Sequence, residues 1–535
     1  MRFVFYFLSL LWFPSVLFAQ ENRPNILLII ADDLGIDAIE GFGLMIENRP
    51  ATPNLQALQV QGLTYTNTWA TPQCTPTRAA IMSGKYGIKT GVMRPPGNLD
   101  LEHESIFSYI NRTTNDAYST AVIGKWHISN PVDLNHPMAH GVDHFEGVIR
   151  GTIDDYYGWE KVENGVTTQE TEYITTHLTN SAIDWIEAQE QPWFLWLSHI
   201  APHGPFQLPP DGLYSLEDPT SDRQLYQASI EALDHEIGRL LDSMTQSTRE
   251  NTLIIFIGDN GTPSRVMDYF PNRHGKGTMF EGGLRVPMIL SGAGVDRPGE
   301  QEAGLTQAVD LYATLIEITS HTLQGGIHNS YSLKASLSQP NTLESRKYIY
   351  SDYRDGETLF WAIKNDRYKL IEDSNGSQEF YRIEESLAEL DNLIASLSEE
   401  EMAILAELEA EANIIRADWS CQDLIQNGTE TAIDSFGNVG GCPNESAEDT
   451  LTSIYSLPNT TLRIFPNPTL EIVHIEVQDQ LRFIASLYNL EGKRILQQRN
   501  PTSISLLSVV PGTYILEIQD LKSGQKIVEE IIKRD

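Results

Sequence analysis

Residues 24–33, with the sequence PNILLIIADD, decide the fold class of this chain. The apolar run Ile26–Ile30 shows no polar alternation, which is typical of a parallel strand buried on both faces of a sheet. Three similar runs follow along the chain, at Ala121–Ile123, Phe194–Leu197 and Leu253–Ile257. Helical stretches lie between the runs, and they include Thr176–Glu187 and Leu225–Met244. This alternation predicts an α/β fold with a mixed, mostly parallel sheet sandwiched by helices.

Polar side chains follow each of the four apolar runs. They are Asp32 and Asp33, then Lys125 and His127, then His199 and His203, and finally Asp259 and Asn260. Ligands bind beyond the carboxyl ends of the strands in open parallel sheets, so we expect these groups at one rim. Taken singly, an Asp or an Asn after a strand is more readily explained as a helix cap or a turn residue than as a functional group. Delivery of such groups by four separate strands favours a functional site.

The residue types at this rim indicate its chemistry. Three carboxylates and one amide offer oxygen ligands only, which suit a hard divalent cation, Ca²⁺ or Mg²⁺, better than zinc. The Lys and His side chains add cationic and acid–base groups. A metal ion surrounded by such groups predicts a site for a tetrahedral oxyanion, stabilised by preorganised charge.

Cys74 is the odd one among three cysteines. Cys421 and Cys442 lie 21 residues apart in a loop-like stretch, and whether they form a disulfide stays open. Pro76 is suited to the first turn of a helix, so Cys74 is expected beside a helix N-terminus, where anions and thiolates are stabilised. A buried structural cysteine is the alternative. Residues 73–94 hold four basic side chains and no acidic one.

The charge of the chain excludes some classes of partner. Its 535 residues include 37 Lys and Arg against 73 Asp and Glu, which gives a formal net charge of −36. This argues against binding to nucleic acid or to an anionic membrane surface, both of which require cationic surface. Residues 383–415 hold ten acidic side chains and no Lys or Arg, so part of the acidity lies away from the motifs in sequence. The basic run 73–94, with Lys125 and Lys276, leaves the expected site able to attract an anion at short range.

The sequence also predicts how the chain is divided. Residues 1–19 combine Arg2 with an apolar run that ends at Ala19, as in a signal peptide. No later segment is long and apolar enough to span a membrane, so we expect an exported, soluble protein without a transmembrane segment. The other predicted segments are an α/β domain 20–344, a smaller α+β subdomain 345–420, a linker 421–461 and a β-sandwich 462–535.

The predicted α+β subdomain combines antiparallel strands with one helix. Its strands are expected at Lys347–Ser351, Phe360–Lys364 and Tyr368–Ile371. Residues 383–415 are expected to be helical, because Leu408 and Ala412 belong to an apolar stripe on one helical face. Ser398 and Glu401 have the spacing of a capping box.

The sequence CTPTR at residues 74–78 resembles the C-x-P-x-R signature of the type I, formylglycine-dependent sulfatases of the alkaline-phosphatase superfamily. Further landmarks of that family occur in order along the chain: PNILLIIADD and TPNLQAL before the signature, and GKWH, APHGP, GDNG and GKGTMFEGGLRVP after it. The resemblance covers residues 24 to about 420 and implies an alkaline-phosphatase-like fold. Thr77 stands where Ser or Ala is more usual, and Ile128-Ser129 stand where Leu-Gly is common, but neither departure touches a catalytic position.

The resemblance implies a modified nucleophile. In the family, a maturation enzyme oxidises the cysteine that corresponds to Cys74 to Cα-formylglycine, and the aldehyde is hydrated. One hydroxyl attacks the sulfur of a sulfate ester, and the second then loses its proton as sulfate is eliminated. A thiol or a serine has no second hydroxyl, which gives a chemical reason for the modification.

The resemblance also implies roles for the other site residues. Asp32, Asp33, Asp259 and Asn260 match the ligands of one Ca²⁺, which the modified Cys74 would complete. Arg78 and Lys125 would hold the diol and the sulfate, and His127 would act as the base for elimination. His203 and Lys276 would bind sulfate or protonate the leaving oxygen, and His199 competes with His203 for that role.

The C-terminal region resembles a second family. Residues 465–468, FPNP, and the strands after them are similar to the C-terminal sorting domain of type IX secretion in Bacteroidetes. The final pattern GTYILEI…KIVEEIIKRD favours sorting over a carbohydrate-binding or spacer β-sandwich. The resemblance implies the type IX secretion machinery as a partner and a secreted or cell-surface location on a bacterium.

Three hypotheses for function follow. The first is a secreted calcium-dependent sulfatase acting on sulfated carbohydrates, with ulvan, carrageenan and fucoidan as first candidates. The second is a phosphomonoester or phosphonate ester hydrolase of the same superfamily, against which the full Cys74 signature speaks. The third is a binding protein that has lost the chemistry, which the complete set of catalytic positions disfavours. Substrate choice would depend on the loops 128–170 and 262–274, where Asp154, Asp155, Tyr156, Tyr157 and Trp159 either line a sugar subsite or form a surface loop.

Overall fold

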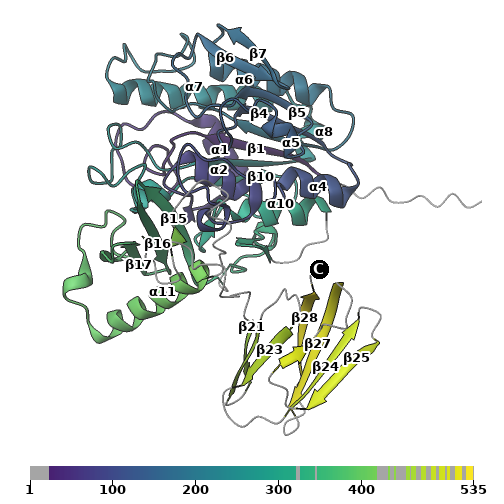
Figure 1. Ribbon diagram of the computed structural model, residues 1–535. Coiled ribbons are helices and arrows are strands. Elements are labelled where there is room, and N and C mark those ends of the chain that lie inside the picture. Colours follow the sequence, from purple (N-terminus) through teal and green to yellow (C-terminus); the bar gives the residue numbers. More distant parts are fainter. Residues whose placement is uncertain are drawn as a thin grey trace, which may run out of the picture. The chain divides into compact units, whose positions relative to one another are not determined.

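The computed structural model describes residues 23–320, 326–343 and 346–417, and the strands of the C-terminal region between residues 432 and 533 (Figure 1). The chain divides into two compact units, Met1–Val439 and Gly440–Asp535. The predicted signal peptide, Cys421 and Cys442 lie outside the described residues. Within the described part of the chain, no helix is long and apolar enough to cross a membrane.

The first unit is built on a ten-stranded mixed sheet with the order β11-β2-β10-β9-β1-β8-β4-β5-β6-β7. The strands are β1 Asn25–Ala31, β2 Gly62–Tyr65, β4 Ser119–Lys125, β5 His144–Val148, β6 Trp159–Glu163, β7 Val166–Glu170, β8 Trp193–Ser198, β9 Thr252–Gly258, β10 Met288–Gly292 and β11 Glu300–Glu302. The central strands β9, β1, β8 and β4 are parallel neighbours. By contrast, β10 and β6 run antiparallel to the strands beside them. Each predicted apolar run lies inside one central strand, which confirms the mixed, mostly parallel sheet.

Helices cover both faces of this sheet (Figure 1). One face packs against α2 Cys74–Ser83, α4 Ile106–Thr114 and α10 Asp310–Ser320, and the other against α1 Pro53–Gln61, α6 Ile174–Glu187 and α7 Asp222–Ser243. Strand β1 contributes to both cores, because Leu28 belongs to the first and Leu27 to the second, and both are fully buried. A strand buried on both faces needs apolar residues at every position, which explains the continuous run at residues 26–30.

Shorter elements connect these layers. They are β3 Thr68–Trp69, α3 Gly87–Thr90, α5 His136–Ala139, α8 Gln246–Glu250, α9 Glu281–Leu284, β12 Thr306–Gln307, β13 Gly326–Ile327, β14 Ser330–Tyr331 and a 3₁₀ helix at Lys334–Leu337. Strands β3 and β12 pair in parallel beside the main sheet. The GKGTMFEGGLRVP motif covers residues 275–287 and so includes helix α9 and residues on both sides of it.

An antiparallel four-stranded sheet follows, with the order β15-β16-β17-β18. Its elements are β15 Ile349–Asp355, β16 Thr358–Lys364, β17 Tyr368–Asp373, β18 Gln378–Arg382 and the helix α11 Glu399–Ala417. Leu408 and Ala412 of α11 pack with Trp361 of this sheet and with Ala80 of α2 in one hydrophobic cluster. The sheet and α11 therefore pack on the α/β layers, and the antiparallel strands agree with the sequence prediction.

The predicted helix over residues 383–415 is wrong in its first half. Residues 383–398 form turns and a short 3₁₀ helix, Leu393–Ala395, and α11 begins only at Glu399. The Asn392 side chain accepts a hydrogen bond from the Ile394 backbone N–H at 3.1 Å and caps the short helix separately. Ser398 and Glu401 form the predicted capping box, in which the Glu401 carboxylate accepts from the Ser398 N–H at 2.9 Å. The segment is not one continuous helix, because Asn392 and Ser398 each cap a separate helical element.

A buried ionic cluster connects α9 to the antiparallel sheet. Glu281 is fully buried and lies 3.3 Å from Lys364 Nζ and 3.2 Å from Lys369 Nζ. It also accepts a hydrogen bond from Trp69 Nε1 at 3.0 Å, and both ammonium groups lie 4.9 Å from the centroid of the Trp69 ring system. Glu389 completes the cluster at 2.7 Å from Lys369.

Replacing Glu281 with Ala should destabilise the first unit by about 3–5 kcal/mol, because it leaves two buried ammonium groups with one carboxylate between them. The measurement is the free energy of unfolding in urea. The control is Glu300→Ala, which breaks an ion pair with Arg297 whose glutamate is 54% exposed, and it should cost no more than about 1 kcal/mol. Equal losses in the two variants would contradict the claim.

The second unit contains two four-stranded antiparallel sheets, with the orders β21-β22-β23-β26 and β25-β24-β27-β28. Their strands are β21 Ser453–Leu457, β22 Thr460–Phe465, β23 Ile472–Val477, β24 Phe483–Asn489, β25 Arg494–Arg499, β26 Ser503–Ser505, β27 Gly512–Asp520 and β28 Lys526–Lys533, and the short pair β19 Ala432–Ile433 and β20 Val439–Gly440 precedes them. Leu487 and Leu516 are buried, as expected for two-faced strands of a β-sandwich. Strand β21 lies inside the predicted linker 421–461, so the first sheet begins upstream of residue 462.

Candidate active site

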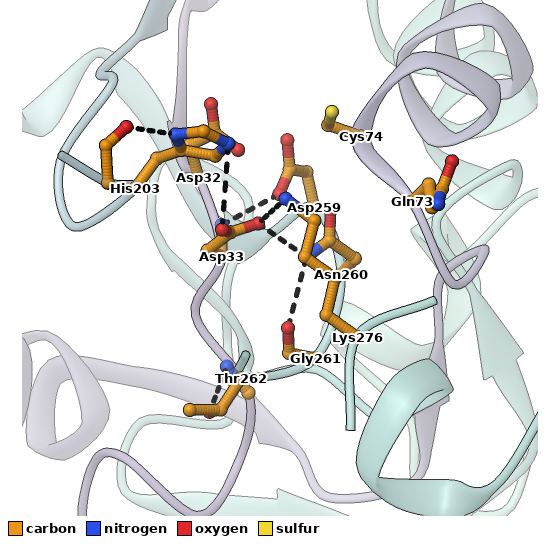
Figure 2. Close-up of polar contacts among 12 residues, drawn as sticks. Asp32, Asp33, Gln73, Cys74, His203, Asp259, Asn260, Gly261, Thr262 and Lys276 are labelled. Atoms are coloured by element: carbon orange, nitrogen blue, oxygen red, sulfur yellow. Dashed lines mark hydrogen bonds and ion pairs between the residues drawn. The ribbon is translucent and has the colours of Figure 1, made fainter. Parts of the chain in front are cut away.

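The site forms where the four central parallel strands end. Strand β1 is in register with both β8 and β9, so that Ile30 pairs with Ser198 and with Ile257. The residues that follow the strands therefore meet at one edge of the sheet, as the sequence predicts. Figure 2 shows Cys74 and Gln73 on one side of the Asp32, Asp33 and Asp259 carboxylates, and His203 on the other.

Four buried oxygen-bearing side chains form the centre of the site, namely Asp32, Asp33, Asp259 and Asn260. The Asp33 N–H donates to Asp259 Oδ1 at 3.0 Å, and Asn260 Nδ2 donates to Asp33 Oδ1 at 2.8 Å. Asp33 has a φ of 69°, a left-handed conformation that lets consecutive carboxylates reach the same space. Asp32 Oδ1 and Asn260 Oδ1 are buried and have no hydrogen-bond partner. Buried acceptors without donors are costly unless a cation contacts them, so this set fits a metal ion with oxygen ligands.

Three basic side chains neutralise these carboxylates. Arg78 is fully buried, and its Nε and Nη2 donate to Asp259 Oδ2 at 3.1 and 2.6 Å. Its Nη1 donates to the Lys125 backbone carbonyl at 3.0 Å and to Ser198 Oγ. Lys125 Nζ pairs with Asp32, and Lys276 Nζ pairs with Asp33. Charged groups of both signs are thus packed in one water-poor space, where their interactions are strong.

Cys74 is the first residue of α2 and is 3% exposed. The prediction that it lies at a helix N-terminus is confirmed. Its Sγ lies 3.3 Å from His127 Nδ1 and within 4.8 Å of carboxylate oxygens of Asp32 and Asp259. Thr75 Oγ1 lies 3.1 Å from the same His127 nitrogen and helps to fix the ring.

The surroundings shift the pKa values of these groups in opposite directions. Burial raises the pKa of Asp259 to about 6, and the negative charge of Asp32 adds to the effect. Burial also acts to raise the pKa of Asp32, but Lys125, His203 and Arg78 outweigh it and hold that pKa below its usual range. Burial and the Lys125 charge lower the pKa of His127 well below 6.5, so this imidazole is neutral at pH 7 and can accept a proton.

The thiol of Cys74 does not follow the expectation for a helix N-terminus. Burial raises its pKa above the usual value, and this effect outweighs the lowering by Lys125 and Lys276. Cys74 is therefore a neutral thiol at pH 7. An unmodified thiol in this state is a poor nucleophile, because the thiolate is the reactive form.

The two candidate histidines of the third strand occupy different places. His203 Nε2 lies 3.7 Å from Asp33 Oδ2, and its Nδ1 lies 2.6 Å from the Gly204 carbonyl, so the ring faces the site. His199 is fully buried, its ring nitrogens have no hydrogen-bond partner, and burial lowers its pKa to about 3. The geometry favours His203 over His199 as the residue that faces a ligand.

Several contacts that shape the site were not predicted from the sequence. Ser198 orients Arg78, Thr75 contacts His127, and Gln73 Nε2 donates to Tyr353 Oη at 3.4 Å beside Cys74. Gln73 and Thr75 flank Cys74 in the signature, so adjacency in sequence was the available signal. Of the suggested sugar-subsite residues, Tyr156 and Trp159 are buried, whereas Asp154 and Tyr157 are exposed. Tyr156 Oη donates to the His203 carbonyl at 2.6 Å, so this buried tyrosine helps to fix the backbone of His203.

Gly151 leaves the space that the His127 ring fills. A Cβ at position 151 would lie 2.0 Å from His127 Nε2. Gly151→Ala should therefore move the ring and reduce kcat about 100-fold, while changing the free energy of unfolding by less than about 1 kcal/mol. The matched control in the same loop is Gly158→Ala, whose Cβ would meet its nearest atom at an ordinary 3.4 Å. Equal kcat values for the two variants would contradict this role of Gly151.

Comparison with known proteins identifies the family. Residues 24–321, more than half of the chain, match the sulfatase family model. The chain therefore belongs to the sulfatase family, whose alkaline-phosphatase-like fold it shares. Residues 463–534 match the secretion system C-terminal sorting domain. This tail marks the chain as a secreted or cell-surface bacterial protein, as the sequence predicts.

Individual relatives are distant. Arylsulfatase J of Mus musculus is 27% identical over 354 residues, which cover 61% of this chain and 58% of the relative, so this chain spans little more than half of that enzyme. A sulfatase of Formosa agariphila is 26% identical over 478 residues, covering 71% of this chain and 84% of the relative. The solved structure of Ps i-CgsB is 26% identical with a TM-score of 0.65, and the match covers 74% of this chain and 94% of that one. Ps i-CgsB has also been solved in complex with k-i-k-neocarrahexaose.

Proposed function

We propose that this protein hydrolyses sulfate esters of sulfated carbohydrates and releases inorganic sulfate, using a nucleophile derived from Cys74. The position of Cys74 carries the proposal. It stands at a helix N-terminus within 4.8 Å of two carboxylates and 3.3 Å from a neutral histidine. This arrangement combines a nucleophile, a proton acceptor and a cation site at one point.

The oxygen ligands support one Ca²⁺ as the metal. Asp32, Asp33, Asp259 and Asn260 would hold it, together with the modified Cys74. The unpartnered Asp32 Oδ1 and Asn260 Oδ1 are the atoms that a hard cation would satisfy. When bound, the ion would supply positive charge for the sulfate oxygens.

The nucleophile would arise by oxidation of Cys74 to Cα-formylglycine by a maturation enzyme. The hydrated aldehyde would supply one hydroxyl to attack sulfur and a second whose deprotonation expels sulfate. The raised pKa of the unmodified thiol supports this assignment, because the cysteine as encoded is unreactive at neutral pH.

The other residues would bind the ester and move protons. His127 Nδ1 faces position 74 and would accept the proton there. Arg78 would fix the Asp259 carboxylate and the nucleophile, and Lys125 and Lys276 would bring positive charge to the sulfate. His203 Nε2, on the opposite side of Asp33, would protonate the leaving oxygen, because it faces the site and His199 does not.

The sorting tail and the family support sulfated polysaccharides as substrates, with ulvan, carrageenan and fucoidan as first candidates. Export would use the type IX secretion machinery. The test is sulfate release by the mature protein from a panel of defined sulfated oligosaccharides. Release from at least one member of the panel, dependent on Cys74, supports the proposal. A protein whose Cys74 is fully converted and which releases no sulfate from any of them would contradict it.

A further inference from the structure

Arg265 lies at the rim of the site in the loop 262–274, between the ligand Asn260 and Lys276 in sequence. Its Nη2 lies 3.2 Å from the position that a Cβ on Gly204 would occupy. Gly204 directly follows His203, whose ring faces Asp33. The guanidinium therefore stands beside the residue that follows the histidine placed to meet the leaving group.

The Arg265 guanidinium is held in place by an aromatic platform. Its Cζ lies 4.4 Å from the centroid of the Phe206 ring. Phe206 packs edge-on against Tyr226 at 5.7 Å, and Tyr226 Oη donates to the Asp33 carbonyl at 2.7 Å. The platform is thus connected to the centre of the site. An arginine stacked on a ring is preorganised, so less entropy is lost when it binds a planar or tetrahedral anion.

The same guanidinium is available to a ligand. The Arg265 side chain is 59% exposed, and its ion pair with Asp222 spans 3.3 Å with an aspartate that is 56% exposed. Exposed pairs of this kind contribute little free energy, so an incoming anion can replace Asp222. The chain has a net charge of −36 and therefore repels polyanions. A fixed cation on the leaving-group side of the site attracts an anionic substrate locally.

We propose that Arg265 binds a second anionic group of the substrate, a sulfate or a carboxylate on the sugar next to the one that loses its sulfate. The proposal rests on the proposed sulfatase function. It makes the protein selective for saccharides with at least two negative charges. The fork of N–H donors on arginine matches both sulfate and carboxylate, so both sources of charge must be tested.

The test compares Arg265→Ala with the wild type on three substrates: 4-nitrophenyl sulfate, a disulfated disaccharide, and a monosulfated disaccharide with a uronic acid. The ratio of kcat/KM for a dianionic substrate to kcat/KM for 4-nitrophenyl sulfate should fall about tenfold in the variant. A fall with the disulfated substrate assigns sulfate, and a fall with the uronate assigns carboxylate. An unchanged ratio with both overturns the proposal.

Arg112→Ala is the matched control. Arg112 is also 59% exposed, pairs with Glu104 and stacks on an aromatic ring, Tyr109, at 4.8 Å. It lies in the last turn of α4, before strand β4 begins, and so at the opposite edge of the sheet from the site. Its removal should leave the ratio unchanged, and a fall equal to that of Arg265→Ala would overturn the proposal by assigning the effect to net charge.

A direct binding measurement separates this proposal from the function on which it rests. If the wild type releases sulfate from no substrate, the proposed function fails, and calorimetric binding of the disulfated disaccharide becomes the readout. Binding about tenfold weaker in Arg265→Ala than in Arg112→Ala would still support the subsite. Equal binding by the two variants would overturn it.

Discussion

Replacing Cys74 with Ala should reduce sulfate release by at least about 1,000-fold, because the covalent route loses its nucleophile and only charge stabilisation is left. Cys74 is small and lies at the start of α2, so the free energy of unfolding should change by less than about 2 kcal/mol. The measurement is kcat/KM for the best substrate of the oligosaccharide panel. Turnover that is unchanged in this variant would refute the proposed mechanism.

The conservative variant Cys74→Ser sharpens this prediction. Serine keeps a hydroxyl but cannot provide the second one, so repeated turnover should be lost as completely as with Ala. The mass of peptides that contain Cys74 provides the chemical control, since conversion of a thiol to an aldehyde makes the residue about 18 Da lighter. Full activity in protein whose Cys74 has the mass of unmodified cysteine would contradict a formylglycine nucleophile.

Removing divalent cations with a chelator should abolish turnover, and Ca²⁺ should restore it. The ion would contact the buried oxygens that have no hydrogen-bond partner, Asp32 Oδ1 and Asn260 Oδ1. Because it binds the folded state, Ca²⁺ at about 1,000 times its Kd should raise the free energy of unfolding by about 4 kcal/mol. Thermal unfolding with and without Ca²⁺ measures this effect.

The pH dependence of this stabilisation follows from Asp259. Burial raises its pKa to about 6, so below that pH a proton must leave the carboxyl before the ion binds. The apparent affinity for Ca²⁺ should therefore fall as the pH is lowered through 6. Asp259→Asn should weaken binding at every pH, whereas Asp242→Asn, which removes an aspartate that is 85% exposed, should not. Full activity after complete chelation would contradict the metal assignment.

The central sheet was predictable because its strands are buried on both faces. Such strands are recognisable in the sequence as continuous apolar runs. The predicted run Ala121–Ile123, for example, lies within β4, Ser119–Lys125, which extends two residues further at each end. The same logic failed for residues 383–398. The Ser398–Glu401 capping box already indicated a helix start at residue 399, but the helix was extended upstream through residues of helix-forming composition. The separate cap at Asn392 was not predicted, because caps depend on backbone conformation that composition does not reveal.

The candidate site was predictable where chemistry follows strands. Asp32 and Asp259 directly follow a central strand, Lys125 is the last residue of β4, and His203 lies in the segment after β8. The rule for parallel sheets was therefore enough to bring them together. Contacts between residues distant in sequence could not be predicted from the sequence. The space that Gly151 leaves for His127 and the pairing of Glu281 with Lys364 depend on how loops and sheets pack, which no local pattern encodes.

The assignment of this site to sulfate esters is tested by comparing sulfate and phosphate release from two esters with the same leaving group, 4-nitrophenyl sulfate and 4-nitrophenyl phosphate. Both esters are tetrahedral and share a scaffold within the superfamily, so the comparison isolates the nucleophile and the metal site. We expect kcat/KM for the sulfate ester to exceed that for the phosphate ester in protein with converted Cys74 and bound Ca²⁺. Faster release of phosphate than of sulfate would contradict the sulfatase function and assign the site to phosphate esters.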